Sequence, residues 1–174
     1  MSANSDIVFT TERTFLRQFT IRDAALIRDL NGDPEVVKFL HEPLLQNDKQ
    51  ALTMLLTILL PQYKNKLGRW AIYTKNGNVF IGWCGLKYRS DLEEIDLGYR
   101  LKKSAWGMGF ATEAASATLE HGFRNLNIPL ITGRAHIDNT SSIRVLEKIG
   151  MHFIREEIVD DCPVRTYILA NPYL

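Results

Sequence analysis

The chain contains little cysteine, no long apolar run and almost no excess charge, and each shortage excludes a class of protein. Cys84 and Cys162 are the two cysteines among 174 residues. Their isolation argues against a disulfide framework and a cysteine-rich zinc site, and it suits a reducing cytosol. A net charge of +1 gives no general attraction to nucleic acid or to an anionic membrane. Any phosphate group must therefore be bound by a local arrangement.

Signals for a membrane span, for secretion and for a metal are also missing. The longest apolar stretch, residues 54–60, is far shorter than the roughly 20 residues that cross a bilayer. The opening residues, MSANSDIVF, lack the basic and apolar regions of a signal peptide and are typical of a short flexible tail, which we place at about residues 1–6. The four histidines have no metal-ligand spacing. We therefore expect a soluble cytoplasmic protein without a metal site.

The composition, with 45% hydrophobic and 24% charged residues, is typical of one globular domain, which we expect to span residues 1–174. Alternating and helical apolar spacings predict its elements. Strands are expected at about 13–19, 69–74, 79–88, 93–101, 130–135, 152–159 and 164–169, and helices at about 20–31, 33–40, 48–63, 110–123 and 139–149. This order predicts a mixed α/β fold. Its central, mostly antiparallel, twisted sheet is flanked by helices.

The strand expected at 93–101 has the clearest alternation in the chain. One face carries Ile95, Leu97, Tyr99 and Leu101, and the other carries Glu94, Asp96, Gly98 and Arg100. This pattern is typical of a half-buried strand.

A glycine-rich stretch follows this strand directly. SAWGMGFATEA, at residues 104–114, places Gly107 and Gly109 at a strand-to-helix junction. The unpaired N–H groups and the positive dipole end of a helix N-terminus favour an anion there. The stretch lacks the GK[ST] ending of a P-loop and is too compressed for the GxGxxG dinucleotide fingerprint. A simple turn without a ligand also explains the two glycines.

Three motifs, in order, resemble signatures of the GNAT superfamily of N-acetyltransferases. They are DLGY at 96–99, WGMGFATEA at 106–114 and NTSSIRVLEKIG at 139–150. The branch with the ribosomal-protein alanine acetyltransferases resembles the chain best, since TERTFLR at 11–17 and DPEV at 33–36 are also similar to it. The resemblance covers nearly the whole chain and implies an enzyme that uses acetyl-CoA as donor.

The resemblance also implies where acetyl-CoA would bind. Its pyrophosphate would accept hydrogen bonds from the backbone amides of Trp106, Gly107, Met108, Gly109, Phe110 and Ala111. The main chain of Leu97, Gly98 and Tyr99 would pair with the pantetheine arm and offer an oxyanion N–H. Asn139 would contact the same arm. Ser104 stands where the family loop often begins with Gln or Arg, which removes a phosphate-facing side chain but leaves the amides.

Two residues are candidates for the chemistry. Asp96 occupies the place of an acidic residue that this branch often has on its central strand, and we predict that it is the base or binds the substrate ammonium. Glu94 is the competing carboxylate on that face, and a solvated Asp96 without a role is the other alternative. Ser142 matches a serine proposed in relatives to protonate the leaving thiolate. Asn139 and Ser142 also suit a helix N-cap and first turn, and the two kinds of role can coexist.

Other reactive or aromatic side chains are assigned no chemistry. For Cys84 we expect a buried thiol rather than an acylated nucleophile. Trp70 is expected in the core, with the wall of an acceptor pocket as the alternative. Lys102 and Lys103 directly precede the loop. Either lysine could supply positive charge to a bound phosphate, or both are solvated residues at the end of the strand.

The expected reaction is direct transfer of an acetyl group to a primary amine. A chain N-terminus, with a pKa of about 8, needs less help from a base than a lysine-type amine, and the resemblance favours a protein or peptide N-terminus. A small amine (an amino acid, a polyamine or an aminoglycoside) is the alternative, and a narrow acidic pocket would favour polycations. A catalytically silent acyl-CoA-binding module is a further hypothesis. We expect a monomer or a homodimer.

Overall fold

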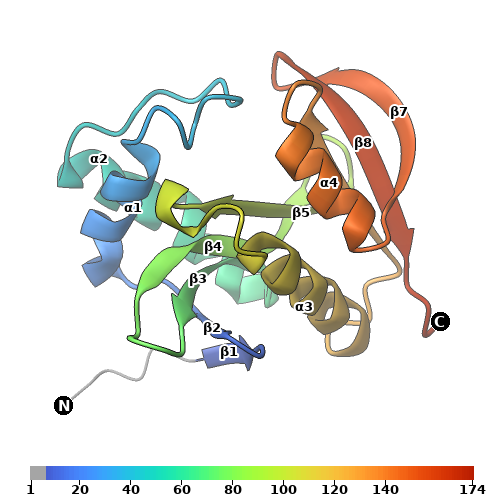
Figure 1. The fold of residues 1–174 in the computed structure, drawn as a ribbon, viewed down its shortest axis with the longest axis horizontal. Helices are drawn as coiled ribbons and strands as arrows, with labels where there is room; N and C mark the ends of the chain where they lie inside the picture. Colours follow the sequence, from blue (N-terminus) through green and yellow to red (C-terminus); the bar gives the residue numbers. More distant parts are fainter. Residues whose placement is uncertain (1–6) are drawn as a thin grey trace.

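A computed structural model describes residues 7–174, and its central feature is one eight-stranded sheet (Figure 1). The tail expected at residues 1–6 lies outside the described residues. The strands are β1 (Ile7–Thr10), β2 (Thr14–Arg17), β3 (Gly68–Thr74), β4 (Phe80–Arg89), β5 (Glu94–Leu101), β6 (Leu130–His136), β7 (His152–Val159) and β8 (Cys162–Ala170). The helices are α1 (Ala24–Asn31), α2 (Asp48–Met54), α3 (Phe110–Arg124) and α4 (Thr140–Lys148). Shorter helical turns are η1 (Ile21–Asp23), η2 (Leu55–Leu59), η3 (Leu60–Asn65) and η4 (Lys103–Ala105).

The strands follow the order β1-β2-β3-β4-β5-β6-β8-β7. Every neighbouring pair is antiparallel except β5 with β6, which run parallel. A parallel pair needs a crossover connection, which the loop after β5 and helix α3 provide. The predicted mixed, mostly antiparallel sheet with flanking helices is confirmed.

Consecutive residues of β3 and β4 point to opposite faces of the sheet. Trp70 and Cys84 belong to a core that includes the buried side of α3, whereas Ala71 and Trp83 belong to a second core with α1 and α2. Figure 1 shows α1 and α2 together at one side of the sheet, and α4 beside β7 and β8. The sheet thus separates two apolar cores, in which each fully buried aliphatic side chain stabilises the fold by about 1.5–3 kcal/mol.

Local signals set the helix ends as the sequence predicts. Thr20 and Asp23 form a reciprocal capping box before α1, and Gly32 is the C-cap of that helix. The side chain of Asn139 caps α4 by accepting a hydrogen bond from the backbone of Ser142. Each of these bonds satisfies a backbone group that a helix end leaves unpaired.

One expected element near the N-terminus is wrong, and one strand is additional to those expected. Residues 33–40 form turns rather than a helix, because the Asp33 carboxylate accepts a hydrogen bond from the Glu35 amide at 2.9 Å and favours a tight turn instead. Ile7 to Phe9, which belong to the stretch with the pattern of a tail, form most of β1 and pair with β2.

The long helix expected at 48–63 changes its hydrogen-bonding pattern twice. Helix α2 passes into the π-helical turn η2 and then into the 3₁₀ turn η3. Pro61 has no N–H to donate to the preceding turn, so a regular α-helix cannot continue through it. The segment stays helical because Leu55 and Leu59 are buried against the sheet.

Candidate active site

The loop between β5 and α3 presents a row of unpaired backbone amides. Gly107 and Gly109 have φ angles of 72° and 80°, in the left-handed region that favours glycine. Within residues 7–174, the N–H groups of residues 107–112 find no hydrogen-bond acceptor. Because the same stretch begins α3, these amides lie at the positive end of a helix dipole and can bind an anion.

Arg13 and Glu113 hold this loop in place. Arg13 donates through Nη1 to the Met108 carbonyl at 2.8 Å and through Nε to Glu113 Oε2 at 2.6 Å. Its guanidinium also lies 4.3 Å from the centre of the Phe110 ring. Thr11 donates its hydroxyl to Glu113 Oε1 at 2.6 Å. Sequence reasoning missed the role of Arg13, although the residue lies in the TERTFLR segment that carries part of the resemblance.

The other loop side chains differ in exposure. Trp106 and Met108 are 44% and 55% exposed, whereas Phe110 is buried. The Trp106 indole donates to the Leu101 carbonyl at 2.9 Å, which anchors the start of the loop. The Lys102 ammonium lies 5.3 Å from the centre of the Phe80 ring, and Lys103 is exposed.

Strand β5 has a free edge directly beside this loop. Its parallel pairing with β6 is confined to Asp96 with Thr132 and Leu97 with Gly133. Beyond Leu97, residues 98–101 have no ladder partner on that side within the described residues 7–174, whereas their other edge pairs fully with β4. The free edge offers backbone donors and acceptors to an extended ligand.

Tyr99 and Ser142 meet on the α3 and α4 side of the sheet. Ser142 Oγ and Tyr99 Oη lie 2.8 Å apart, and Tyr99 Oη also donates to the Ser142 carbonyl at 3.0 Å. Burial raises the pKa of the Tyr99 phenol well above its ordinary value, so the phenol is protonated at neutral pH. Asn139 accepts from the Ser142 amide at 3.1 Å, which brings these three predicted residues together.

Asp96 lies on the opposite side of β5 and is held by an arginine that sequence reasoning missed. Arg134 Nη1 is 2.9 Å from Asp96 Oδ1, and Arg134 Nη2 is 2.5 Å from Glu94 Oε2. Glu157 approaches Arg134 Nε at 3.6 Å. Burial raises the pKa of Asp96, while Arg134 lowers it, and burial prevails. No sequence signal marks Arg134, because it is a single charge within a predicted strand.

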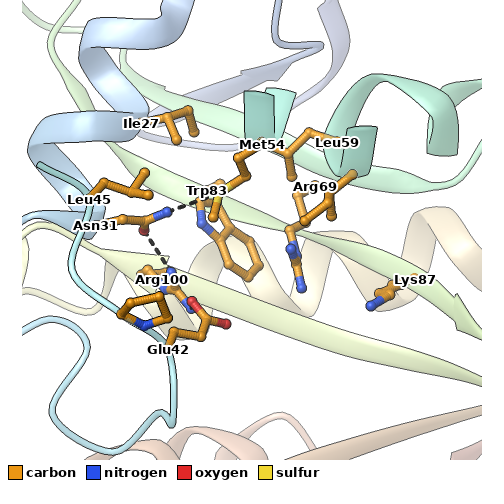
Figure 2. Close-up of a pocket in the computed structure, with 12 residues that line it drawn as sticks. Ile27, Asn31, Glu42, Leu45, Met54, Leu59, Arg69, Trp83, Lys87 and Arg100 are labelled. Carbon is orange, nitrogen blue, oxygen red and sulfur yellow. Dashed lines mark hydrogen bonds and ion pairs between the residues drawn. The ribbon is translucent and has the colours of Figure 1, made fainter. Parts of the chain in front are cut away.

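A cavity of about 310 Å³ lies on the same side of the sheet as Asp96 (Figure 2). It is lined by Ile27, Asn31, Glu42, Pro43, Leu45, Met54, Ile58, Leu59, Arg69, Trp83, Lys87 and Arg100. Lys87 lies opposite Asp96 in the β4–β5 ladder, and directly opposed side chains point to the same face. The Asp96 side chain therefore points to the same face of the sheet as Lys87, one of the residues that line the cavity.

Gly98 leaves room beside this cavity. A β-carbon at Gly98 would come within 3.3 Å of the Trp83 ring, so a larger residue would press on that wall. Trp83 rather than Trp70 lines the space: Trp70 is 1% exposed and packs edge-on against Phe9 and His121. The alternative that Trp70 walls an acceptor pocket is therefore wrong.

Cys84 has no nucleophilic character in this arrangement. It is fully buried, and its sulfur lies 3.3 Å from the Thr118 hydroxyl. Burial raises the pKa of the Cys84 thiol to about 12, so the thiolate is scarce at neutral pH. Residues 7–174 contain no group of three His, Cys, Asp or Glu side chains that could hold a metal ion. Over the same residues, no helix has the length and apolar character needed to cross a membrane.

Comparison with known proteins agrees with this geometry. The family model described as "Acetyltransferase (GNAT) domain" matches residues 13–152. The chain is 30% identical over 152 residues to the "Uncharacterized N-acetyltransferase p20" of Bacillus licheniformis, covering 87% of this chain and 84% of the relative.

Solved structures share the fold at low identity. The ribosomal-protein-S5-alanine acetyltransferase from Vibrio fischeri superposes with a TM-score of 0.78 at 19% identity over 96% of this chain and 98% of that one. The spermidine N-acetyltransferase from Vibrio cholerae, solved with CoA and spermine, superposes with a TM-score of 0.77 at 15% identity. The match covers 91% of this chain and 96% of that one. With a family model that covers most of its length, an amide-lined loop and a sheet of this topology, the chain belongs to the GNAT family of acetyltransferases.

Proposed function

We propose that this protein transfers an acetyl group from acetyl-CoA directly to a primary amine. The observation that carries the proposal is the row of unpaired amides at residues 107–112, which lies beside the free edge of β5. A side chain at Gly109 would start 3.3 Å from Arg13 Nη2 and press on the arginine that holds this loop. The residues present therefore fit a pyrophosphate followed by an extended arm.

The chain's own residues would hold the donor along this path. Acetyl-CoA supplies the acetyl group as a thioester. The amides of residues 107–111 bind its phosphates, and the free edge of β5 at Gly98 and Tyr99 aligns the arm and offers an oxyanion N–H. The Trp106 amide donates to the Lys103 carbonyl at 3.1 Å and Leu97 pairs with Gly133, so the two residues flank these donors rather than supply them. The Asn139 side chain combines its cap of α4 with a contact to the arm.

The proton-handling groups lie on opposite sides of β5. Asp96, on the cavity side, takes a proton from the acceptor ammonium directly or through water. Ser142 Oγ and Tyr99 Oη, 2.8 Å apart on the other side, hold a proton for the departing thiolate.

The acceptor has two candidates. The resemblance to ribosomal-protein acetyltransferases favours a protein or peptide N-terminus. The cavity of about 310 Å³ favours a small-molecule amine, since it falls at the lower end of the roughly 300–1,000 Å³ range of small-ligand sites.

The test is release of free thiol from acetyl-CoA with a panel of acceptors: ribosomal-protein N-terminal peptides, amino acids, polyamines and aminoglycosides. Turnover with any of these supports the proposed transfer, and the class that reacts identifies the acceptor. Binding of acetyl-CoA without thiol release, insensitive to Asp96→Asn and Ser142→Ala, would instead indicate a silent acyl-CoA-binding module.

A further inference from the structure

The cations around the cavity divide into paired and unpaired ones. Arg100 contacts Glu42 at 3.0 Å and donates to Asn31 Oδ1 at 2.6 Å. Within residues 7–174, Arg69 and Lys87 have no carboxylate partner and no side-chain hydrogen bond. Figure 2 shows Arg69 beside Trp83 and Lys87 farther along the same side, with no dashed line reaching either of them.

Arg69 is held by an aromatic ring instead of a carboxylate. Its guanidinium carbon lies 4.6 Å from the centre of the Trp83 ring, a cation–π contact that fixes the group without neutralising it. Burial, followed by repulsion from Arg100, lowers the pKa of Arg69 to about 10. The guanidinium is still charged at neutral pH, and in the described part of the chain it forms no direct ion pair, although Glu42 and Asp96 raise its pKa from a distance.

Lys87 is a second charged side chain of the cavity that forms no direct ion pair within residues 7–174. Burial lowers the pKa of Lys87, and Arg69 and Arg89 lower it further, which outweighs the opposite effect of Asp160 and Asp96. Arg89 is occupied by Asp91 and Asp160, at 2.9 and 2.8 Å. Asp96 lies opposite Lys87 in the ladder, but its carboxylate forms its ion pair with Arg134. Among the described residues, Lys87 therefore forms no ion pair of its own, and the two carboxylates that raise its pKa, Asp96 and Asp160, each pair with an arginine.

We propose that the acceptor amine carries an anionic group, a carboxylate or a phosphate, which binds between Arg69 and Lys87 while the amine itself meets Asp96. The inference rests on the proposed function and specifies its acceptor. An uncompensated charge in a partly desolvated site is unfavourable, and an anion that pairs with it is bound strongly.

The same charges disfavour polycations. Polyamines and aminoglycosides would bring further positive charge next to Arg69 and Lys87, and such repulsion is strongest where water is excluded. The anion can come from a small amino acid or from an acidic residue beside a peptide N-terminus. The small cavity favours the free molecule, and the assay includes both sources.

The first experiment compares acceptors that differ only in charge. Thiol release from acetyl-CoA is measured with acidic amino acids, with aminophosphonates, with peptides that begin Ala-Glu, and with the carboxamide or glutamine counterpart of each. We expect kcat/KM for the charged member to exceed that of its neutral partner by about tenfold or more. Equal rates within every pair, or turnover of polyamines alone, would overturn the inference and leave the transferase function standing.

The second experiment removes the cations. Arg69→Met and Lys87→Met should each erase most of the preference for the charged acceptor, whereas Arg69→Lys should retain part of it. The matched controls are Arg22→Met and Lys64→Met, which remove exposed charges from η1 and η3 and should keep the preference. A preference unchanged in both cavity variants would exclude Arg69 and Lys87 as its source.

A binding measurement decides the inference independently of turnover. Titration calorimetry with inorganic phosphate is run in saturating coenzyme A, so that the loop amides are not available to the probe. Binding that both cavity variants lose and both controls keep supports the anion site, even if no acceptor reacts. Absence of binding by the native protein to phosphate and to the charged acceptors contradicts it. Failure to bind coenzyme A or to release thiol counts against the proposed function alone.

Discussion

The pKa of the Asp96 carboxyl is subject to two opposing effects, and their balance decides when the group can act as a base. Burial raises the pKa of its carboxyl above the ordinary value, and Arg134 at 2.9 Å lowers it. We predict that Asp96→Asn lowers kcat by about 10²–10⁴-fold, the usual contribution of a general base. The dissociation constant for acetyl-CoA should stay the same, because the loop lies elsewhere. Steady-state kinetics and calorimetry measure the two quantities.

Glu94→Gln is the matched control, because Glu94 is the other β5 carboxylate that pairs with Arg134. It breaks an equivalent ion pair and should leave kcat within about threefold of the native value, since the carboxylate at Asp96 remains. If both variants lose activity equally, the ion-pair network rather than a base at Asp96 supports turnover.

A separate prediction concerns the effect of Arg134 on the pH dependence of kcat/KM. Its positive charge favours the ionised form of Asp96, so Arg134→Met should raise the pKa of that carboxyl further. A base must be ionised to act, so activity falls as the pH drops through this pKa. The acidic limb of the kcat/KM profile should therefore move to higher pH in the variant. An acidic limb that stays in place would show that Asp96 does not control it.

At the scale of elements, the turn from β5 into α3 depends on glycine. Gly109 has φ of 80°, and Gly109→Val should weaken acetyl-CoA binding by about tenfold or more, because the side chain intrudes on the amides. Gly150→Val is the control, since Gly150 has φ of 86° and open space around its α-carbon. Left-handed backbone costs both variants about 1–2 kcal/mol of stability. If both also lose affinity equally, instability rather than intrusion explains the loss.

The contact between the start of β2 and the loop gives a second element-scale prediction. Arg13→Met removes the donor to the Met108 carbonyl and should loosen the loop, which weakens acetyl-CoA binding by several-fold. Arg165→Met is the control: Arg165 forms an exposed ion pair with Glu156, also lies over an aromatic ring as Arg13 does, and is 42% exposed, against 43% for Arg13. Exposed ion pairs contribute about 0.2–1 kcal/mol to the free energy of unfolding. Urea unfolding should therefore give nearly the same stability for the Arg13→Met and Arg165→Met variants. Equal acetyl-CoA affinity in both would exclude a loop-positioning role for Arg13.

At the scale of the whole molecule, the proposed function places the donor at the β5–α3 loop and the acceptor in the cavity, on different sides of β5. Acetyl-CoA should therefore slow amide hydrogen exchange in residues 98–112 and leave β7 unchanged. When the acetyl-CoA concentration is about 100 times the dissociation constant, amide hydrogens that exchange only in the free protein should exchange up to about 100-fold more slowly. Mass spectrometry of peptic fragments measures this, and equal protection of β7 would point to a general stabilisation instead of binding at the loop.

Much of the fold follows from signals that are local in the chain. The capping box at Thr20, the cap at Asn139, the Asn-Gly hairpin turn at residues 76–78 and the alternation of β5 each involve groups a few residues apart. The errors also have local causes. The turns at 33–40 arise from a competing side-chain bond, and strand β1 forms only because β2 is available as its partner.

The sequence by itself determined the family, the glycine turn and the two faces of β5, because motif order and side-chain alternation are properties of neighbouring residues. Only the tertiary structure decided which charges meet. Arg13 and Glu113 are 100 residues apart in the chain, and Arg134 reaches Asp96 from another strand. Arg69 and Lys87 are left unpaired for the same reason: whether a charge has a partner depends on distances that sheet pairing and burial set, not on composition or local pattern.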